Sequence, residues 1–191
     1  ALWIVGIHGA TIVTSFLTPI VLSNMAANQA GAHIPLAGEF NNCFVTIGGS
    51  GATLGMVIFI TFFAKSAQLS ALGKAAVVPA LFNINEPILF GMPVVYNPYT
   101  AIPFFLAPMA SMSIAYFAIK FQMVNPPIAH VAWPTPIGLS GFIGSGGDWR
   151  AAVLAVVCAL VAFVIWLPFV KFYDGKLYHD EQANAQAQAV A

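Results

Sequence analysis

Residues 82–91 read Phe-Asn-Ile-Asn-Glu-Pro-Ile-Leu-Phe-Gly, and Glu86 in this stretch is the only charged residue between Lys74 and Lys120. Apolar sequence lies on both sides of it. In a membrane protein, an isolated ionisable side chain within an apolar segment marks a substrate or ion site. The interpretation of Glu86 therefore depends on whether this chain lies in a membrane.

The composition is that of a membrane protein. Hydrophobic residues make up 60% of the 191 residues and charged residues only 6%, whereas soluble domains carry roughly 25% charged residues. Several uncharged stretches reach the roughly 20 residues that cross a bilayer, and they lie at 40–64, 87–119, 121–147 and 151–170. The composition predicts an all-α, polytopic integral membrane protein in a lipid bilayer. A formal net charge of zero gives no indication of a nucleic-acid partner.

About four spanning helices are predicted. They lie at about 1–24, 40–64, 100–122 and 150–171. The chain starts without Met, which suggests a fragment or the C-terminal half of a longer protein. The tail at 174–191 is polar, and its Ala- and Gln-rich end is expected to be disordered. The positive-inside rule places most lysines on the cytoplasmic face.

Two further segments are apolar but broken by proline and glycine, at about 71–97 and 126–147. Proline removes a backbone donor and interrupts a helix. Irregular backbone at membrane depth is tolerated only when it is buried in protein or lines a cavity. These segments therefore predict two re-entrant hairpins, the first with Glu86 near its tip. Two interrupted segments are also the pattern of a transporter site.

Five short motifs carry a family resemblance: residues 3–9 (Trp-Ile-Val-Gly-Ile-His-Gly), 48–55 (Gly-Gly-Ser-Gly-Ala-Thr-Leu-Gly), 82–87, 133–136 (Trp-Pro-Thr-Pro) and 146–150 (Gly-Gly-Asp-Trp-Arg). Together and in this order they resemble enzyme IIC, the membrane component of bacterial sugar phosphotransferase systems. The lactose/cellobiose/diacetylchitobiose branch is the most similar. The motifs cover about residues 1–173, which the resemblance identifies as a substrate-binding domain.

This resemblance implies a sugar permease in the bacterial plasma membrane that moves a disaccharide inward. A cytoplasmic IIB partner, supplied by IIA, phosphorylates the sugar, and the phosphoryl group is carried on a cysteine of IIB. Cys43 and Cys158 of this chain then need no reactivity, and no cofactor is implied. Whether this component itself counts as an enzyme stays open. Full-length members form homodimers through an N-terminal domain.

The resemblance also implies site residues. The family's substrate-contacting His and its Asn-Glu pair fall on His8, Asn85 and Glu86, while Trp3 and Trp133 offer flat faces for sugar rings. Sugar sites combine a few converging polar groups with an apolar surface. Glu86 is expected to bind a sugar hydroxyl and to accept its proton as the phosphoryl group arrives.

Structural roles remain open for the same residues. Glu86 could instead tie down the hairpin by accepting backbone N–H bonds, His8 could bond a neighbouring helix, and Trp133 could be an interfacial anchor. The run at 48–51 lacks the Lys-Ser/Thr of a phosphate-binding loop and favours close packing. The four histidines lack metal-ligand spacing, so no metal site is expected.

Three other functions are compatible with parts of the pattern. An ion-coupled secondary transporter could use Glu86 to carry a proton. An intramembrane enzyme would need a nucleophile with a base or a metal set, and a passive channel would bind no sugar saturably. The sequence does not identify the disaccharide, although overall resemblance favours β-linked glucose or N-acetylglucosamine.

Overall fold

The computed structural model describes residues 9–92 and 97–190, and within these ranges every regular element is helical. The prediction of an all-α chain is confirmed for this part of the protein. Along the chain the helices are α1 (Gly9–Gln29), η2 (Asn41–Val45, a short π-helix), α2 (Leu54–Phe62), α3 (Ala67–Leu81), α4 (Glu86–Gly91), α5 (Pro98–Lys120), α6 (Leu139–Gly144) and α7 (Trp149–Val190).

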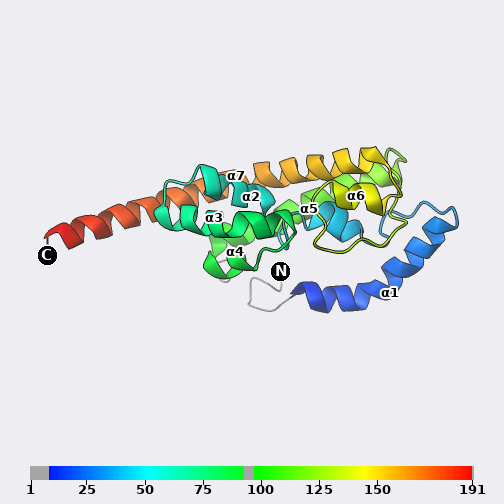
Figure 1. Cartoon of the computed structure of the whole chain (residues 1–191), viewed down its shortest axis with the longest axis horizontal. Coiled ribbons are helices and arrows are strands. Elements are labelled where there is room, and N and C mark those ends of the chain that lie inside the picture. The colour runs from blue at the N-terminus through cyan, green and yellow to red at the C-terminus, as the bar shows by residue number, and fades with distance from the viewer. Residues whose placement is uncertain (1–8, 93–96, 191) are drawn as a thin grey trace.

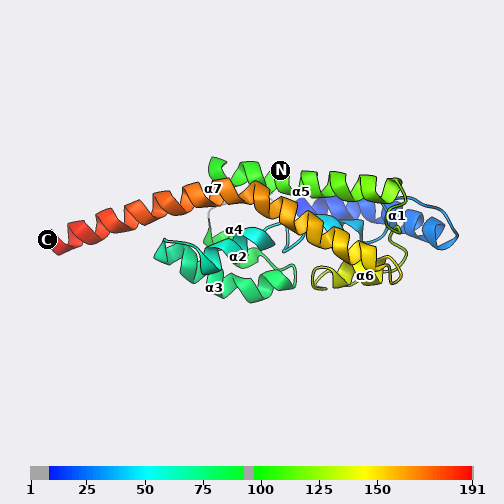
Figure 2. The same cartoon turned by 90° about the horizontal axis from the view of Figure 1, so that it is seen from above.

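Helix α7 is the longest helix, and α5, α2, α6 and η2 pack against it (Figure 1). Figure 2 shows α5 on one side of α7 and α3 on the other, with α2 in contact with both α3 and α7. Trp166 of α7 is fully buried at the centre, and its Nε1 donates a hydrogen bond to the carbonyl of Gly51 at 2.9 Å. The core therefore joins the long helix to the glycine-rich loop before α2.

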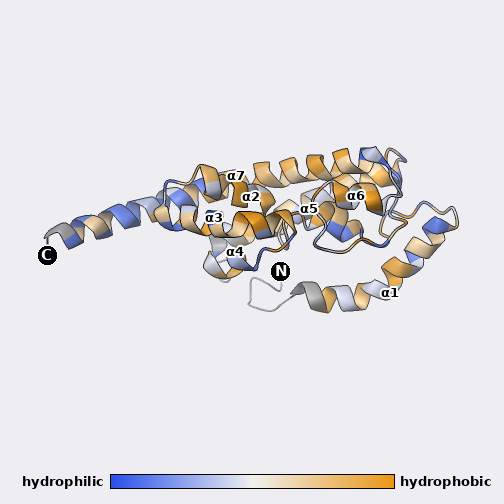
Figure 3. Cartoon of the chain, viewed as in Figure 1, coloured by the Kyte–Doolittle hydropathy of each residue, from blue (hydrophilic) through white to orange (hydrophobic). Residues whose placement is uncertain are grey.

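Two helices are long and apolar enough to cross a membrane among the residues that the structure describes, at Tyr99–Lys120 and Trp149–Gln188. The first coincides with the predicted span at 100–122, and the second contains the predicted span at 150–171 and extends beyond it. Figure 3 shows hydrophobic residues concentrated in the middle of α7 and hydrophilic residues toward its C-terminal end. Several of these apolar side chains face outward, including Val153, Leu160 and Val164. Such a surface is suited to contact with lipid.

The segment predicted as a span at 40–64 is not one continuous helix. It consists of η2, an irregular loop at 46–53, and α2. Gly48, Gly49 and Gly51 have φ angles of 74°, 93° and 85°, which glycine adopts without steric cost. A right-handed helix cannot continue through such angles, so the glycine run divides the segment.

The C-terminal tail also differs from the expectation. Instead of becoming disordered after residue 183, α7 continues to Val190. Ala, Gln and Glu have high helix propensity, and a helix already formed is extended more readily than one that must nucleate. Part of the tail is held in place as well, because the Glu181 carboxylate accepts hydrogen bonds from the hydroxyl of Ser66 and from the backbone N–H groups of Ala67 and Gln68.

Asp174 fixes the connection between α2 and α3. Its carboxylate is buried and accepts hydrogen bonds from the backbone N–H groups of Lys65 and Ser66, all at 3.0 Å. Asp174→Asn is expected to lower the free energy of unfolding by about 1–3 kcal/mol, because the change removes the charge that strengthens these bonds and places an NH2 group, which cannot accept, where Oδ2 faces the N–H of Lys65. Thermal unfolding in detergent measures this change. The exposed Asp180 is the matched control, and equal effects of Asp174→Asn and Asp180→Asn would contradict the prediction.

Candidate functional site

The turn between α3 and α4 carries the isolated acid. Helix α3 ends with the N–H of Ile84 bonded to the carbonyl of Pro79 and the N–H of Asn83 bonded to that of Ala80, each at 3.1 Å. This is the bonding of a Schellman helix end, with Asn83 in the left-handed conformation at φ 61°. Asparagine tolerates this conformation better than most residues. The chain then turns directly into α4, which begins at Glu86.

The Asn83 side chain links three separate segments. Its Oδ1 accepts a hydrogen bond from the N–H of Gly48 at 2.8 Å, and its Nδ2 donates to the carbonyls of Trp133 and Thr135 at 3.0 and 3.1 Å. The residue is only 8% exposed. One amide therefore joins the turn at 82–85, the glycine-rich loop at 48–51 and the irregular segment that contains Trp133.

Asn85 anchors the same turn at a second point. Its Nδ2 donates to the carbonyl of Ser50 at 2.6 Å and to the hydroxyl of Thr53 at 3.1 Å, and the side chain is 3% exposed. Gly49 lies against it so closely that an added Cβ would come within 2.4 Å of the Asn85 side chain. Both hydrogens of this amide bond the protein. The glycine run thus serves close packing, as its sequence favoured, with Asn85 as the group packed against it.

Glu86 is exposed, and no residue in the described ranges donates a hydrogen bond to its carboxylate or forms an ion pair with it. The alternative in which Glu86 ties down the hairpin finds no donor among these residues. Asn83 and Asn85 perform that role instead. The turn is therefore held in place by its two asparagines, and the carboxylate beside them is left free.

Trp133 lies next to this turn through its bond from Asn83, and it is 52% exposed. Its segment folds back on itself, because the N–H groups of Ile128 and Ala129 both bond the carbonyl of Gly144, at 2.8 and 3.1 Å. The structure thus brings Asn85, Glu86 and Trp133 to one region. His8 and Trp3, the other two predicted site residues, lie outside the described residues.

A polar contact between Glu39 and His130 adds another link to the Trp133 segment. Oε1 of Glu39 lies 2.7 Å from Nδ1 of His130, and Oε2 accepts a hydrogen bond from Asn42 at 2.5 Å. Sequence reasoning missed Glu39, which lies in a polar stretch far from His130 along the chain. Within the described ranges, no cluster of three or more His, Cys, Asp or Glu residues could hold a metal ion.

Asp148 fixes the other end of the same segment, where α7 begins. Burial opposes its ionisation, but hydrogen bonds from the Arg150 side chain and from the N–H groups of Asn125 and Arg150 outweigh that effect and hold the pKa of the carboxyl below its usual value. Asp148 and Arg150 form an ion pair at the start of α7, with Oδ1 of Asp148 3.0 Å from Nε of Arg150. The pair has a structural role and contacts none of the predicted site residues that the structure describes.

The family model and the relatives that match this chain all belong to phosphotransferase systems or are IIC permease components. The family described as "Phosphotransferase system, EIIC" matches residues 1–108. The chain is 40% identical to the lichenan permease IIC component of Bacillus subtilis (strain 168), over 94% of this chain and 41% of that protein. It is also 40% identical to the cellobiose-specific EIIC component of Geobacillus stearothermophilus, over 96% of this chain and 43% of that protein.

A solved structure also matches most of this chain. The crystal structure of the transporter ChbC, the IIC component of an N,N'-diacetylchitobiose-specific phosphotransferase system, superposes with a TM-score of 0.89 and 44% sequence identity. The match covers 95% of this chain and 44% of ChbC. The chain therefore spans less than half the length of the proteins that it matches.

Proposed function

Because the chain belongs to the phosphotransferase system EIIC family, we propose that it forms the sugar-binding part of a permease that carries a disaccharide inward for phosphorylation by a IIB partner. Relatives are named for cellobiose, for lactose and for N,N'-diacetylchitobiose. Two of these sugars are β-linked disaccharides of glucose or N-acetylglucosamine. This agrees with the substrate class that the sequence favours, and such a disaccharide is the proposed substrate.

The free carboxylate of Glu86 is the observation that carries this proposal. Two buried asparagines hold the turn that carries it, and Asn83 also bonds the backbone carbonyl of Trp133, a residue that is 52% exposed. An acceptor on a fixed turn and an exposed aromatic side chain on the neighbouring segment are groups that a sugar hydroxyl and a sugar ring require. His8 and Trp3 are proposed to complete the site. Asn85 is proposed to act there by fixing Glu86, since its amide hydrogens are bonded within the protein.

The proposed chemistry at Glu86 is proton acceptance. A sugar hydroxyl oxygen forms a bond to the phosphorus carried by the IIB cysteine, and the sulfur–phosphorus bond breaks. The hydroxyl proton passes to the Glu86 carboxylate, so that charge does not accumulate on the attacking oxygen. The chain's own contribution is to hold the hydroxyl and to remove its proton, and the phosphoryl group comes from the partner.

The proposed architecture follows the sequence, with one change of detail. Four segments cross the bacterial plasma membrane, and that at 40–64 does so as two helical pieces separated by the glycine-rich loop. The segments at 71–97 and 126–147 enter as re-entrant hairpins. Two observations support this arrangement. Helices α3 and α4 are joined by a tight turn, and the backbone N–H groups of Ile128 and Ala129 bond the carbonyl of Gly144, which brings the two ends of the second segment together. The full-length protein is proposed to be a homodimer.

Transport into vesicles that contain the full-length protein tests the function. Supplied with IIB, IIA and a phosphoryl donor, the vesicles are expected to accumulate a phosphorylated disaccharide, and collapse of the proton gradient should leave the rate unchanged. Cellobiose, diacetylchitobiose and lactose are offered separately to identify the substrate. Uptake that requires the proton gradient but not IIB would overturn the proposal in favour of an ion-coupled transporter.

A further inference from the structure

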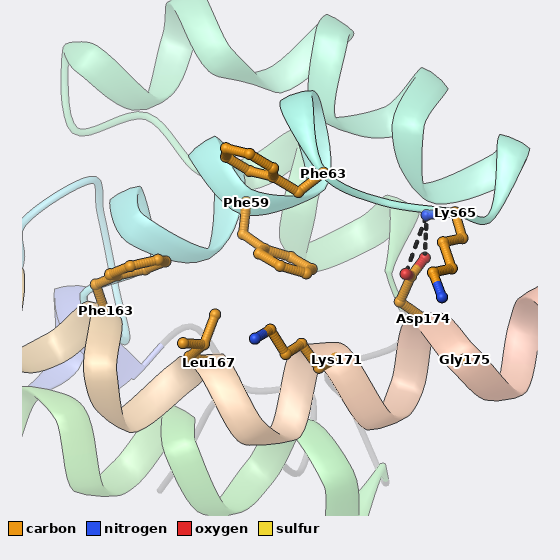
Figure 4. A pocket seen from close by; sticks show the side chains of 8 residues that line it. All are labelled: Phe59, Phe63, Lys65, Phe163, Leu167, Lys171, Asp174 and Gly175. Atoms are coloured by element: carbon orange, nitrogen blue, oxygen red, sulfur yellow. Dashed lines mark hydrogen bonds between the residues drawn. The ribbon is translucent and has the colours of Figure 1, made fainter.

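A groove of about 570 Å³ lies between α2 and α7 (Figure 4), and none of the residues that line it belongs to the turn that carries Glu86. Its walls combine aromatic and aliphatic side chains with two lysines: Phe59, Phe63, Phe163, Leu167, Lys65 and Lys171. An open groove with both apolar and cationic walls is suited to an amphiphile that carries a negative charge. The groove shares no lining residue with the proposed sugar site.

The lining is ordered along α7. Phe163, Leu167 and Lys171 are spaced four residues apart, which places them on one face of the helix. At a rise of about 1.5 Å per residue, they extend over roughly 12 Å. The apolar residues lie toward the hydrophobic middle of α7 and the lysine lies toward its hydrophilic end (Figures 3 and 4). The groove therefore runs from the polar boundary of the span into its apolar part.

The two lysines are available to a ligand. Among the described residues, neither Lys65 nor Lys171 forms an ion pair or a cation–π contact, whereas Lys120 and Lys176 lie over tyrosine rings. Asp174 also lines the groove, but the residue is only 4% exposed, and its carboxylate bonds the backbone N–H of Lys65 (Figure 4) and that of Ser66. The accessible charge in the groove is therefore positive.

We propose that this groove binds one anionic phospholipid. Its phosphate lies between Lys65 and Lys171, and an acyl chain lies along Phe59, Phe163 and Leu167. Basic pockets beside membrane helices bind anionic headgroups through such lysines, and the stems of the lysines extend along the apolar wall while their ammonium groups remain at the polar boundary. A zwitterionic lipid has no net charge for the two ammonium groups to attract.

Native mass spectrometry of the full-length protein in detergent tests the proposal, with phosphatidylglycerol and phosphatidylcholine titrated separately. One molecule of phosphatidylglycerol is expected to bind in preference. Lys65→Gln/Lys171→Gln should weaken its binding by about 30-fold, because each basic residue near an anionic headgroup contributes about fivefold. Both lysines are exposed, so the double variant should fold, as circular dichroism would show. Lys74→Gln/Lys120→Gln, two exposed lysines outside the groove, is the matched control and should bind normally.

A second variant tests the apolar half of the groove. Leu167→Trp narrows the position of the acyl chain and is expected to weaken phosphatidylglycerol binding while both lysines remain. Equal binding of the two lipids, or unchanged binding by the lysine double variant, would overturn the proposal. So would displacement of the lipid by millimolar inorganic phosphate, which would indicate a site for a free anion.

Discussion

Glu86→Gln is expected to slow phosphorylation-coupled uptake by about 100- to 10,000-fold, which is the usual contribution of a positioned acid–base group. Glutamine keeps the size and an acceptor oxygen but cannot take the hydroxyl proton. Disaccharide affinity should fall by about tenfold or less, since one charged hydrogen bond becomes a neutral one. The rate of sugar-phosphate formation in vesicles and the Kd from titration of the purified protein measure the two effects separately.

Thermal stability supplies the control for this variant. Because Glu86 is exposed and no described residue bonds its carboxylate, Glu86→Gln should leave the unfolding temperature unchanged. Asp174→Asn, by contrast, should lower it. Unchanged affinity together with unchanged uptake in Glu86→Gln would refute the role proposed for this residue. A large loss of stability would instead point to a structural role.

Asn83→Ala should lower the free energy of unfolding by about 3 kcal/mol or more. The change removes the partner of the buried Gly48 N–H, which costs about 1–3 kcal/mol when it is left unpaired, and the partner of the part-buried Trp133 and Thr135 carbonyls, each bond contributing about 0.5–1.5 kcal/mol. Alanine is also strained at a φ of 61°, by about 1–2 kcal/mol. Sugar affinity should fall as well, because Trp133 loses its tie to the Glu86 turn.

Asn83→Gly separates these two causes. Glycine accepts the left-handed conformation without strain, but it restores none of the three hydrogen bonds. It should therefore recover about 1–2 kcal/mol relative to alanine and remain well below the parent protein in stability and in sugar affinity. Full recovery by glycine would show that backbone conformation alone matters at this position, and that the side-chain bonds do not hold the site together. Thermal unfolding and sugar titration are the two measurements.

The positions of two long helices and of one turn were predicted from the sequence. Helices α5 and α7 follow from uncharged stretches long enough to cross a bilayer, and the position of the Glu86 turn follows from the prolines around it. The break at 46–53 was not predicted, because Gly48, Gly49 and Gly51 are also compatible with close packing within a helix. Only the positive φ angles distinguish these two roles.

The sequence identified two residues of the candidate site but not the contacts that each of them makes. The sequence singled out Glu86 and Asn85 together, yet no residue that the structure describes bonds the Glu86 carboxylate, whereas Asn85 bonds Ser50 and Thr53. Asn83 was overlooked, although an asparagine directly after a helix is a signal for a left-handed cap. Its partners lie 35 to 52 residues away. Such bonds depend on the tertiary arrangement, which no local pattern reveals.

The linkage through Asn83 limits how this protein can move. The glycine-rich loop, the Glu86 turn and the Trp133 segment cannot separate without breaking one buried and two part-buried hydrogen bonds. A conformational change that preserves these bonds must move the three segments together as one rigid body. A sugar held at the proposed site would therefore travel together with all three segments, and none of these segments could swing aside alone to release it.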